Sequence, residues 1–427
     1  MMRVGDSFCP GILHAVEAKD GLLTRIRVPG GMISPSQLEA IAEISTAFSD
    51  GQVEITSRSN LQLRAIQNKN LNYLVHELDS AGFIPSPQHD RVRNLMASPF
   101  AGLDLGEVLD PRPFVKELDR RLIADQRMAA LPPKFSFAID GGGSWFNRDS
   151  DDLALRAVTI DNVHYFHLAI GGVSSGFGVR VDRGVECAVE AAKKYLDISK
   201  ALGIPARGKK IASSPEAMAR LLDELSDFFV SCPPPGGSNL VLDMPVGAYV
   251  TNQVGFVKVV PSIPLGRLTA EQTKCVASVA REWDGDIRLA PWRGVVLGAI
   301  PESSISQVTA TLQKAGLSLD GRDGYRGIAA CSGSAGCDAS LADVRRDASL
   351  LAFRLSGHEA KSGWTVNISG CEKQCAMRNG ATAELIANSS GYDIRINGQL
   401  VASNSSLGSV IETLVASHSV ISVEVPS

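Results

Sequence analysis

The stretch GLLTRIRVPGGMISPSQLEA, residues 21–40, returns later in the chain as GFVKVVPSIPLGRLTAEQTK, residues 255–274. Both copies begin with an apolar run, pass through a turn that contains Gly and Pro, and reach a Ser or Thr suited to a helix N-cap. The likeness continues further on, where TSRSNLQL, residues 56–63, aligns with APWRGVVL, residues 290–297. A repeat of this length predicts two copies of one folding unit.

Each copy has the residue pattern of a small mixed half-domain. An apolar strand is expected at about 23–28 in the first copy and at about 256–260 in the second. The helices expected near 35–48 and 270–283 carry apolar residues at helical spacing. Two further strands and a second helix complete each unit, so we expect two half-domains of the β-α-β-β-α type.

The segments that follow the two copies also match each other, although more weakly. RNLMASPFAG, residues 93–102, matches RGIAACSGSAG, residues 326–336. FAIDGGG, residues 137–143, matches VNISGCE, residues 366–372. The chain is therefore expected to be a duplicated two-part module. The later part carries four cysteines that the earlier part lacks, namely Cys331, Cys337, Cys371 and Cys375.

The four cysteines form two closely spaced pairs, C-x5-C and C-x3-C. At comparable places the earlier part has Ser98 and Gly142, which indicates one working metal site and one degenerate relic. Four thiolates suit either zinc or a 4Fe–4S cluster. Zinc pairs commonly leave two to four residues between cysteines, so the spacing favours a cluster, with zinc and ordinary core cysteines as alternatives. Cys371 and Cys375 are expected to share one face at the start of a helix.

The overall composition excludes several classes of protein. A formal net charge of −4 provides no global basic field for nucleic acid. No apolar run reaches the roughly 18–20 residues of a membrane span, and the first residues lack the apolar core of a secretory signal. We therefore expect a cytoplasmic protein with reduced thiols, in which metal ligation is favoured over disulfides.

The cysteine pattern, placed in the second half of a duplicated chain, resembles that of the sulfite and nitrite reductase family. The resemblance extends over nearly the whole chain. It implies an α+β fold with two ferredoxin-like half-domains and two α/β central domains. It also implies that the four cysteines hold a 4Fe–4S cluster, and that in the siroheme enzymes the last of them, here Cys375, bridges to the siroheme iron.

The resemblance and the repeats together divide the chain into four units. Residues 1–85 are expected to form the first ferredoxin-like half-domain, which pairs with the second at 250–320. Residues 86–249 are expected to form a first central domain without a cluster, and residues 321–427 a second one that carries it. The stretch CPPPGGSN, residues 232–239, is the clearest linker, because its prolines and glycines interrupt helices and central strands.

The siroheme reductases of this family gather four basic side chains over an oxyanion substrate. The resemblance matches Arg58, Arg93 and Lys134 to three of these positions. Ser136 stands where the fourth, a lysine, is expected. The loss of one cation from a site built for a small dianion argues against sulfite reduction.

Two further features resemble the oxygen-dependent branch of the family, which acts in aerobic cobalamin synthesis. They are the stretch CPGILHAVEAKDGLLTRIRVPGG, residues 9–31, and Lys373 inside the C-x3-C pair. This resemblance implies a monooxygenase whose substrate is the tetrapyrrole precorrin-3A. One oxygen atom from O2 enters at C20, and the ring A acetate closes a γ-lactone. A siroheme-dependent sulfite or nitrite reductase is the alternative, and a tetrapyrrole carrier without catalysis is a third hypothesis.

A tetrapyrrole with eight carboxylates needs local cations on an acidic chain. The loop GIPARGKKIASS, residues 203–214, offers three substrate-binding candidates beside Arg58, Arg93 and Lys134; they are Arg207, Lys209 and Lys210. The remaining candidates are Arg25, Arg27, Arg64, Arg288 and Arg293. For the loop, an ordinary solvated charged segment is the competing interpretation.

The oxygen-dependent branch is also expected to use a mononuclear non-haem iron, whose ligands the sequence does not identify. His164 and His167 lie three residues apart in an expected strand, so they point to opposite faces. His167 is the candidate for a catalytic role, and a structural histidine is the alternative. IGGVSSGFG, residues 170–178, lacks the order of a nicotinamide-binding fingerprint. Electrons are therefore expected from an external NADH-linked reductase or ferredoxin, and the protein is expected to be a monomer.

Overall fold

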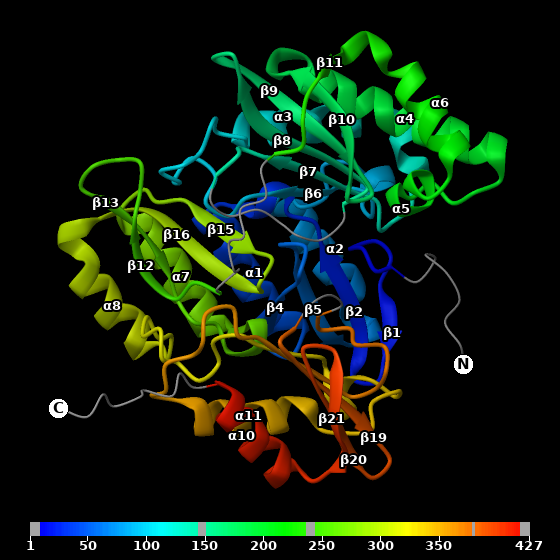
Figure 1. The fold of residues 1–427 in the computed structure, drawn as a ribbon. Helices are drawn as coiled ribbons and strands as arrows, with labels where there is room; N and C mark the ends of the chain where they lie inside the picture. Colours follow the sequence, from blue (N-terminus) through cyan, green and yellow to red (C-terminus); the bar gives the residue numbers. More distant parts are fainter. Residues whose placement is uncertain (1–8, 144–150, 236–243, 378–380, 419–427) are drawn as a thin grey trace, which may run out of the picture.

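The computed structural model describes residues 9–143, 151–235, 244–377 and 381–418, and Figure 1 shows its fold. Within these residues the chain forms four sheets with helices packed on them, which confirms the expected α+β fold. The expected linker at 232–239 lies partly outside the described residues. None of the described helices is both long enough and apolar enough to cross a membrane.

The first repeat builds a five-stranded antiparallel sheet in the order β1-β2-β5-β4-β14. The strand bounds are Val16–Ala18 (β1), Gly21–Ile26 (β2), Gln52–Ile55 (β4), Leu61–Ile66 (β5) and Arg267–Thr269 (β14). Its helices are α1 (Pro35–Phe48) and α2 (Leu71–Ser80). Buried apolar residues alternate with polar ones along β4 and β5, so the face of these strands that turns away from the apolar core is polar.

The second repeat builds an equivalent sheet in the order β12-β13-β16-β15-β3. The strand bounds are Met32–Ile33 (β3), Gly247–Val250 (β12), Phe256–Val260 (β13), Ile287–Ala290 (β15) and Gly294–Pro301 (β16). Its helices are α7 (Ala270–Glu282) and α8 (Ile305–Lys314). The expected half-domain pattern is therefore confirmed in both repeats, with short strands added to it.

The two repeats exchange one short strand each. The strand β14 from the second repeat pairs with β4, where Arg267 lies opposite Glu54. The strand β3 from the first repeat pairs with β15, where Met32 lies opposite Arg288. One apolar core runs through both repeats, and the two half-domains form a single unit. The sequence does not predict the exchanged strands, because two or three residues are too few to show a period.

The duplication is also visible in the backbone. Ser59 and Arg293 occupy equivalent positions in the two repeats, and their φ angles are 53° and 65°. Ala65 and Ala299 are equivalent in the same way, with a φ of 54° in each. Because a positive φ is uncommon outside glycine, its return at matched positions indicates that both repeats keep the same turns.

The first central domain is a six-stranded sheet in the order β11-β10-β9-β8-β7-β6. The strand bounds are Asn94–Ala97 (β6), Ser136–Asp140 (β7), Leu153–Ile160 (β8), Val163–Ile170 (β9), Val173–Arg180 (β10) and Phe229–Ser231 (β11). Its helices are α3 (Arg112–Ala124), α4 (Gly184–Leu202), α5 (Gly208–Ala212) and α6 (Pro215–Glu224). Strands β6, β7 and β8 run parallel, and β8, β9 and β10 alternate in direction.

The second central domain repeats this topology in the order β17-β18-β19-β20-β21. The strand bounds are Ile328–Ala330 (β17), Val366–Ser369 (β18), Ala383–Asn388 (β19), Gly391–Ile396 (β20) and Gln399–Ser405 (β21). Its helices are α9 (Gly333–Gly336), α10 (Val344–Leu355) and α11 (Leu407–His418). Strands β17, β18 and β19 run parallel, and β19, β20 and β21 alternate, as in the first central domain.

One local prediction is wrong, because no helix begins at Cys371. Residues 371–377 form a turn followed by irregular chain. Gln374 has a φ of 45°, which a right-handed helix does not permit, and its N–H donates to the carbonyl oxygen of Cys371 at 3.4 Å. A short helix, α9, lies instead between Cys331 and Cys337.

Candidate functional site

The two cysteine loops leave the same edge of the second central sheet. The strands β17 and β18 are parallel neighbours, with Ala330 opposite Ile368. Cys331 directly follows β17, and Cys371 follows the end of β18. Because the carboxyl ends of parallel strands meet at one edge, both cysteine pairs start there. The Gly370 N–H donates to the sulfur of Cys331 at 3.3 Å and joins the two loops directly.

A second contact holds the other parts of these loops together. The N–H of Leu341, which follows the Cys337 turn, donates to the carbonyl oxygen of Gly370 at 2.8 Å. A Cβ atom at Gly370 would lie 1.8 Å from the hydroxyl oxygen of Ser340. Only glycine fits there, and its absence of a side chain lets the two loops close on each other.

The four cysteines lie at or near the surface of the second central domain. Cys375 is exposed and the other three are partly exposed. In the part of the chain that the structure describes, no three His, Cys, Asp or Glu side chains converge on one ion. Zinc needs four ligands at about 2.0–2.3 Å, whereas a 4Fe–4S cluster spreads its thiolates around four irons. Two thiolate pairs at one edge of the sheet accord with the expected cluster, and no ligand set for a mononuclear iron is found among the described residues.

Three cations from the half-domains reach the backbone of the cysteine loops. Lys19 and Arg64 each donate to a carbonyl oxygen of the C-x5-C loop at 2.7 Å. Arg293 donates to the carbonyl oxygen of Ala376, the residue after Cys375, also at 2.7 Å. Both half-domains therefore take part in holding the loops.

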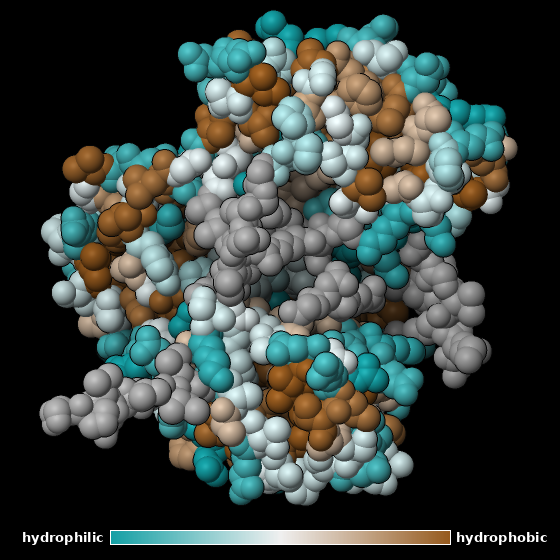
Figure 2. Space-filling model, viewed as in Figure 1, coloured by the Kyte–Doolittle hydropathy of each residue, from teal (hydrophilic) through white to brown (hydrophobic). Residues whose placement is uncertain are grey.

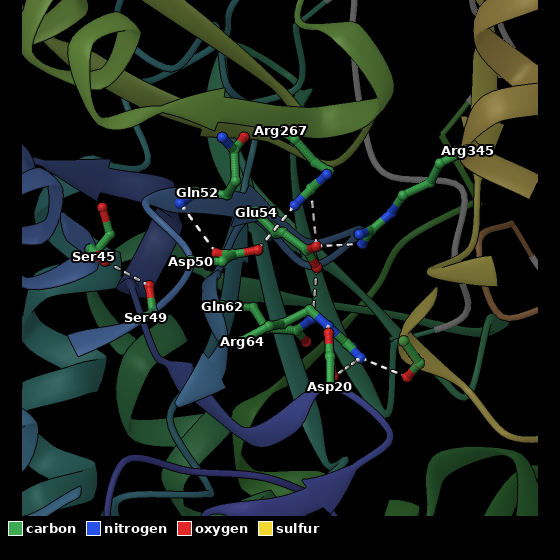
Figure 3. Close-up of polar contacts among 11 residues, drawn as sticks. Asp20, Ser45, Ser49, Asp50, Gln52, Glu54, Gln62, Arg64, Arg267 and Arg345 are labelled. Carbon is green, nitrogen blue, oxygen red and sulfur yellow. Dashed lines mark hydrogen bonds and ion pairs between the residues drawn. The ribbon is translucent and has the colours of Figure 1, made fainter. Parts of the chain in front are cut away.

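A row of polar side chains crosses the first half-domain sheet on its non-core face (Figure 3). Arg25 donates to the side-chain carbonyl oxygen of Gln62 at 2.9 Å. The Gln62 amide donates to Glu54 at 2.8 Å. Arg267 lies 3.2 Å from the same carboxylate of Glu54, which also binds Arg345 on α10. The row thus links the cluster-bearing central domain to the side chain of Arg25.

Four arginines, Arg25, Arg27, Arg58 and Arg293, form what we call the arginine cluster. Arg27 is 3 % exposed, and burial, together with the neighbouring charge of Arg25, lowers its pKa to about 10. Burial, and in addition the charge of Arg58, lowers the pKa of Arg25. Burial, and in addition the charge of Arg25, lowers the pKa of Arg293. Two nitrogens of Arg27, Nε and Nη1, have no hydrogen-bond partner among the described residues. The third nitrogen of Arg27, Nη2, donates to the carbonyl oxygens of Pro10 and Arg91 at 3.2 and 3.3 Å, so the backbone holds the side chain while two of its donors are left for an anion.

The molecule has a hollow on the face shown in Figure 2. Hydrophilic side chains border the visible part of the hollow, between the upper and lower lobes. Figure 1 shows that these lobes are the two central domains, with the sheets of the half-domains beside them. A hollow bordered by hydrophilic side chains and by three parts of the chain offers room for a large polar ligand.

The equivalent place in the second repeat is closed. Gln62 of the first repeat corresponds to Val296 of the second, and Val296 packs in one apolar cluster with Val260, Phe100 and Leu103. Phe100 and Leu103 come from the loop after β6, where the first central domain has lost its cysteines. The relic site is therefore occupied by these apolar side chains and by Lys258, whose ammonium lies 4.5 Å from the centre of the Phe100 ring, while its counterpart keeps Gln62.

Comparison with known families agrees with this organisation. The nitrite/sulfite reductase ferredoxin-like half domain matches residues 14–81 and 250–315. The nitrite and sulphite reductase 4Fe-4S domain matches residues 88–198. The chain belongs to the nitrite and sulfite reductase family. The last matched range is the central domain that carries Ser98 and Gly142 in place of cysteines, so that domain keeps the family fold without the cysteine set.

Several family members are similar to this chain over most of its length. The ferredoxin–nitrite reductase of Synechococcus elongatus is 27 % identical and covers 89 % of this chain and 78 % of its own. The precorrin-3B synthase of a Sinorhizobium species is 28 % identical, with 91 % and 82 % covered. The solved NirA protein of Mycobacterium tuberculosis has a TM-score of 0.76 at 23 % identity, over 92 % of this chain and 79 % of its own. The comparisons establish the family and the fold, and an iron–sulfur cluster accords with both.

The residues expected at the four basic positions of the family reductases lie in different environments in this structure. Arg58 lies in the turn between β4 and β5, beside Arg25. Arg93 forms a two-point ion pair with Asp119 of α3, with both distances 2.7 Å, and its side chain is 8 % exposed. Lys134 is partly buried before β7, and Ser136 is 3 % exposed inside it. Of the four positions, one therefore carries an arginine that is paired with a carboxylate, Arg93, and one carries no cation, Ser136.

The candidates in the loop at 203–214 lie in two environments. Arg207 donates to the buried carboxylate of Asp152 at 2.8 Å, which fixes the loop against the first central sheet. Lys209 and Lys210 are exposed on α5. Of the remaining candidates, Arg288 is 1 % exposed and binds Asp286 at 2.6 Å, so it acts within the fold.

His167 lies inside the six-stranded sheet of the first central domain. Its Nε2 is 2.8 Å from the hydroxyl of Ser174, and the side chain is 4 % exposed. Burial first, and then the charge of Arg156, lowers its pKa. His164 is exposed and contacts Thr159, so the two histidines point to opposite faces as predicted. This environment suits a structural histidine that stays neutral.

Sequence reasoning missed Lys19, Glu54, Gln62 and Arg345. Glu54 and Gln62 could have been found from the alternation of the strands QVEI and LQLR, because both occupy positions opposite to the apolar core residues. Lys19 and Arg345 carry no such signal, since each acts on a segment far away in the sequence.

Proposed function

We propose that this chain is an oxygen-dependent monooxygenase that hydroxylates precorrin-3A at C20 and forms the γ-lactone, as a precorrin-3B synthase. The observation that carries the proposal is the state of the anion site. Two of the four basic positions of the family reductases are unavailable, because Arg93 is ion-paired with Asp119 and Ser136 replaces a lysine. A small oxyanion loses the cations that would hold it, whereas a large polycarboxylate still has the arginine cluster.

The arginine cluster binds the substrate through its carboxylates in this proposal. The unpartnered nitrogens of Arg27 and the Nε of Arg25 donate to acetate or propionate groups. Gln62 holds Arg25 in place, because its carbonyl oxygen accepts from Arg25 while its amide is fixed on Glu54. Lys209 and Lys210 are exposed on α5 and are further candidates for binding the substrate carboxylates.

The proposed cluster ligands are Cys331, Cys337, Cys371 and Cys375. A 4Fe–4S cluster bound there supplies electrons one at a time. The reaction places one atom of O2 in the substrate and the other in water, which requires two electrons and two protons. An external donor, ferredoxin or an NADH-linked reductase, provides the electrons. Because the described residues offer no ligand set for a mononuclear iron, no step is assigned to one.

The test is turnover of precorrin-3A by the protein with its cluster reconstituted. With O2 and a reductant, the product should be one oxygen atom heavier than the substrate, and without O2 the mass should not change. A substrate that keeps its mass in the presence of O2, reductant and an intact cluster would overturn the proposal.

A siroheme-dependent sulfite or nitrite reductase is the second candidate. It is favoured by the similar identity of the reductase relatives, 27 % against 28 %, and by the complete cysteine set. Purified protein with strong siroheme absorption bands, and oxidation of a reduced viologen dye on addition of sulfite or nitrite, would support it. A tetrapyrrole carrier would bind the tetrapyrrole but turn over with no reductant.

A further inference from the structure

We infer that Arg293 is a positioning residue for the cysteine cluster, whose positive charge makes the cluster easier to reduce. The inference rests on the proposed cluster ligands, but not on the identity of the substrate. It assigns Arg293 to the electron path rather than to the binding of substrate carboxylates alone.

The fold brings Arg293 to the C-x3-C loop through a turn that both repeats share. Arg293 lies between β15 and β16 with a φ of 65°, and the equivalent residue of the first repeat is Ser59, with a φ of 53°. A Cβ atom at Gly266 would lie 2.5 Å from the Cβ of Arg293, so glycine leaves the space that the arginine stem needs. Both repeats therefore have this turn, but the first repeat has Ser59 at the position where the second has Arg293, which reaches the C-x3-C loop.

The side chain of Arg293 spans from the second half-domain to the second central domain. Its Nη2 donates to the carbonyl oxygen of Ala376 at 2.7 Å, directly after Cys375. Burial holds the pKa of Arg293 below its ordinary value, and the charges of Glu54, Cys331 and Cys375 oppose this shift. A guanidinium keeps its proton at neutral pH even so. A fixed positive charge therefore lies close to two of the proposed cluster ligands.

Arg293 differs from Arg64, the other arginine that reaches a cysteine loop, in its lack of a carboxylate partner. No ion pair to Arg293 is found among the described residues, whereas Arg64 is held by both oxygens of Asp20 at 2.9 Å. Arg64 likewise donates to a carbonyl oxygen of a cysteine loop, that of Gly336. Arg64 therefore holds a loop while it is paired directly with a carboxylate, whereas Arg293 holds one without an ion pair, with Glu54 acting on it only through its field.

The third tether, Lys19, contributes less field. Lys19 donates to the carbonyl oxygen of Ser334 in an exposed position, where water and salt screen its charge. Reduction adds one negative charge to a cluster, and a nearby unscreened cation stabilises that charge. Of the three tethers, Arg293 is therefore the one that should shift the reduction potential upward.

The experiment compares reduction potentials of the reconstituted cluster by titration followed with electron paramagnetic resonance. Arg293→Gln should keep its iron and sulfide but have a more negative potential, and Arg293→Lys should stay near the wild type. Arg64→Gln is the matched control, since it removes a tether whose charge is compensated, and its potential should change less. An unchanged potential in Arg293→Gln with full iron content, or an Arg293→Lys variant as low as Arg293→Gln, would overturn the inference.

A second variant covers the case in which Arg293→Gln fails to hold a cluster. Asp20→Asn leaves the Arg64 tether in place but removes the carboxylate that compensates it. Its potential should be more positive than that of the wild type, and an unchanged potential would contradict the role of uncompensated charge. If the wild type itself assembles no cluster, the ligand assignment in the proposed function fails instead, so the two failures are distinguishable.

Discussion

Arg345 on α10 is ion-paired with Glu54 on β4, although the two residues belong to opposite halves of the chain. Glu54 is 13 % exposed at its side chain and also binds Arg267 and Gln62. One carboxylate thus joins the cluster-bearing domain, the exchanged strand of the second repeat and the strand that orients Arg25. It is the point at which the two parts of the proposed site are held in register.

Removing this carboxylate should weaken the whole assembly. Glu54→Gln leaves Arg267 and Arg345 in a partly buried place without their shared anion, which should cost about 3 kcal/mol of unfolding free energy. Urea denaturation followed by circular dichroism measures the loss. Glu117→Gln, whose partners Arg120 and Arg121 are exposed on α3, should have a much smaller effect. Equal losses in the two variants would remove Glu54 from this role.

Arg27 should matter for the affinity of a polycarboxylate. Arg27→Met keeps an apolar stem of similar length but loses the two unpartnered nitrogens, and it also loses the bonds of Nη2 to the carbonyl oxygens of Pro10 and Arg91, so the unfolding free energy is measured beside binding. Binding of uroporphyrin, a tetrapyrrole with eight carboxylates, should weaken roughly tenfold or more. Fluorescence quenching of the porphyrin measures this, with Arg121→Met on the surface of α3 as the control. Unchanged affinity in a folded Arg27→Met protein would contradict the assignment.

The closed relic site should contribute stability but no binding. Phe100 is 7 % exposed and packs with Leu103, Val260 and Val296. Phe100→Ala should lower the unfolding free energy by about 3 kcal/mol because it opens a cavity. Uroporphyrin affinity should stay within a factor of about two of the wild type. A folded Phe100→Ala protein that binds a second porphyrin would contradict this prediction, because it would show that the Phe100 side chain alone prevents binding at the relic site.

The cysteine assignment makes a direct prediction about iron. Cys371→Ser should lose the brown colour and about four irons per chain, because one ligand of the cluster is removed. Cys275→Ser is the matched control, since Cys275 lies on α7, packs against the half-domain core and donates from its sulfur to the carbonyl oxygen of Thr311 at 3.8 Å. Full iron and sulfide content in Cys371→Ser would refute its role as a ligand.

The buried His418 should lower the free energy of unfolding of the second central domain as the pH falls below neutral. It packs edge-on against Trp364 at 4.5 Å between ring centroids, and burial, followed by the charge of His358, lowers its pKa to about 4. An unfolded histidine binds a proton near pH 6.5, so stability is lost as pH falls from there towards 4. Between pH 7 and pH 5 the wild type should lose roughly 2 kcal/mol more than His418→Leu. Parallel urea curves for both proteins at the two pH values test this, and identical losses would contradict it.

The repeat could be recognised from the sequence because its helix starts are strong local signals. Ser34 caps α1 and Thr269 caps α7, and each forms a reciprocal capping box with the glutamine three residues later, Gln37 and Gln272. These bonds depend only on neighbours in the chain. The helix expected at Cys371 fails for the opposite reason, because Gln374 is held in a left-handed conformation by a loop that packs on distant segments.

The candidate site was predictable in its chemistry but not in its connections. The four cysteines and the arginines could be named from spacing and charge. Whether an arginine is available depends on a partner elsewhere in the fold, as Asp119 for Arg93 and Asp20 for Arg64 demonstrate. The reach of Arg293 to Ala376 also depends on how two domains meet. Such contacts have no periodicity in the sequence and arise only when the domains pack.

The most direct test of the proposed function is turnover of precorrin-3A under 18O2 by the cluster-loaded protein, analysed by mass spectrometry. The account predicts a lactone product that carries one 18O atom, formed only when O2 and an electron donor are both present. An unlabelled or unreacted tetrapyrrole, together with siroheme absorption and reduction of sulfite or nitrite by the same preparation, would contradict it.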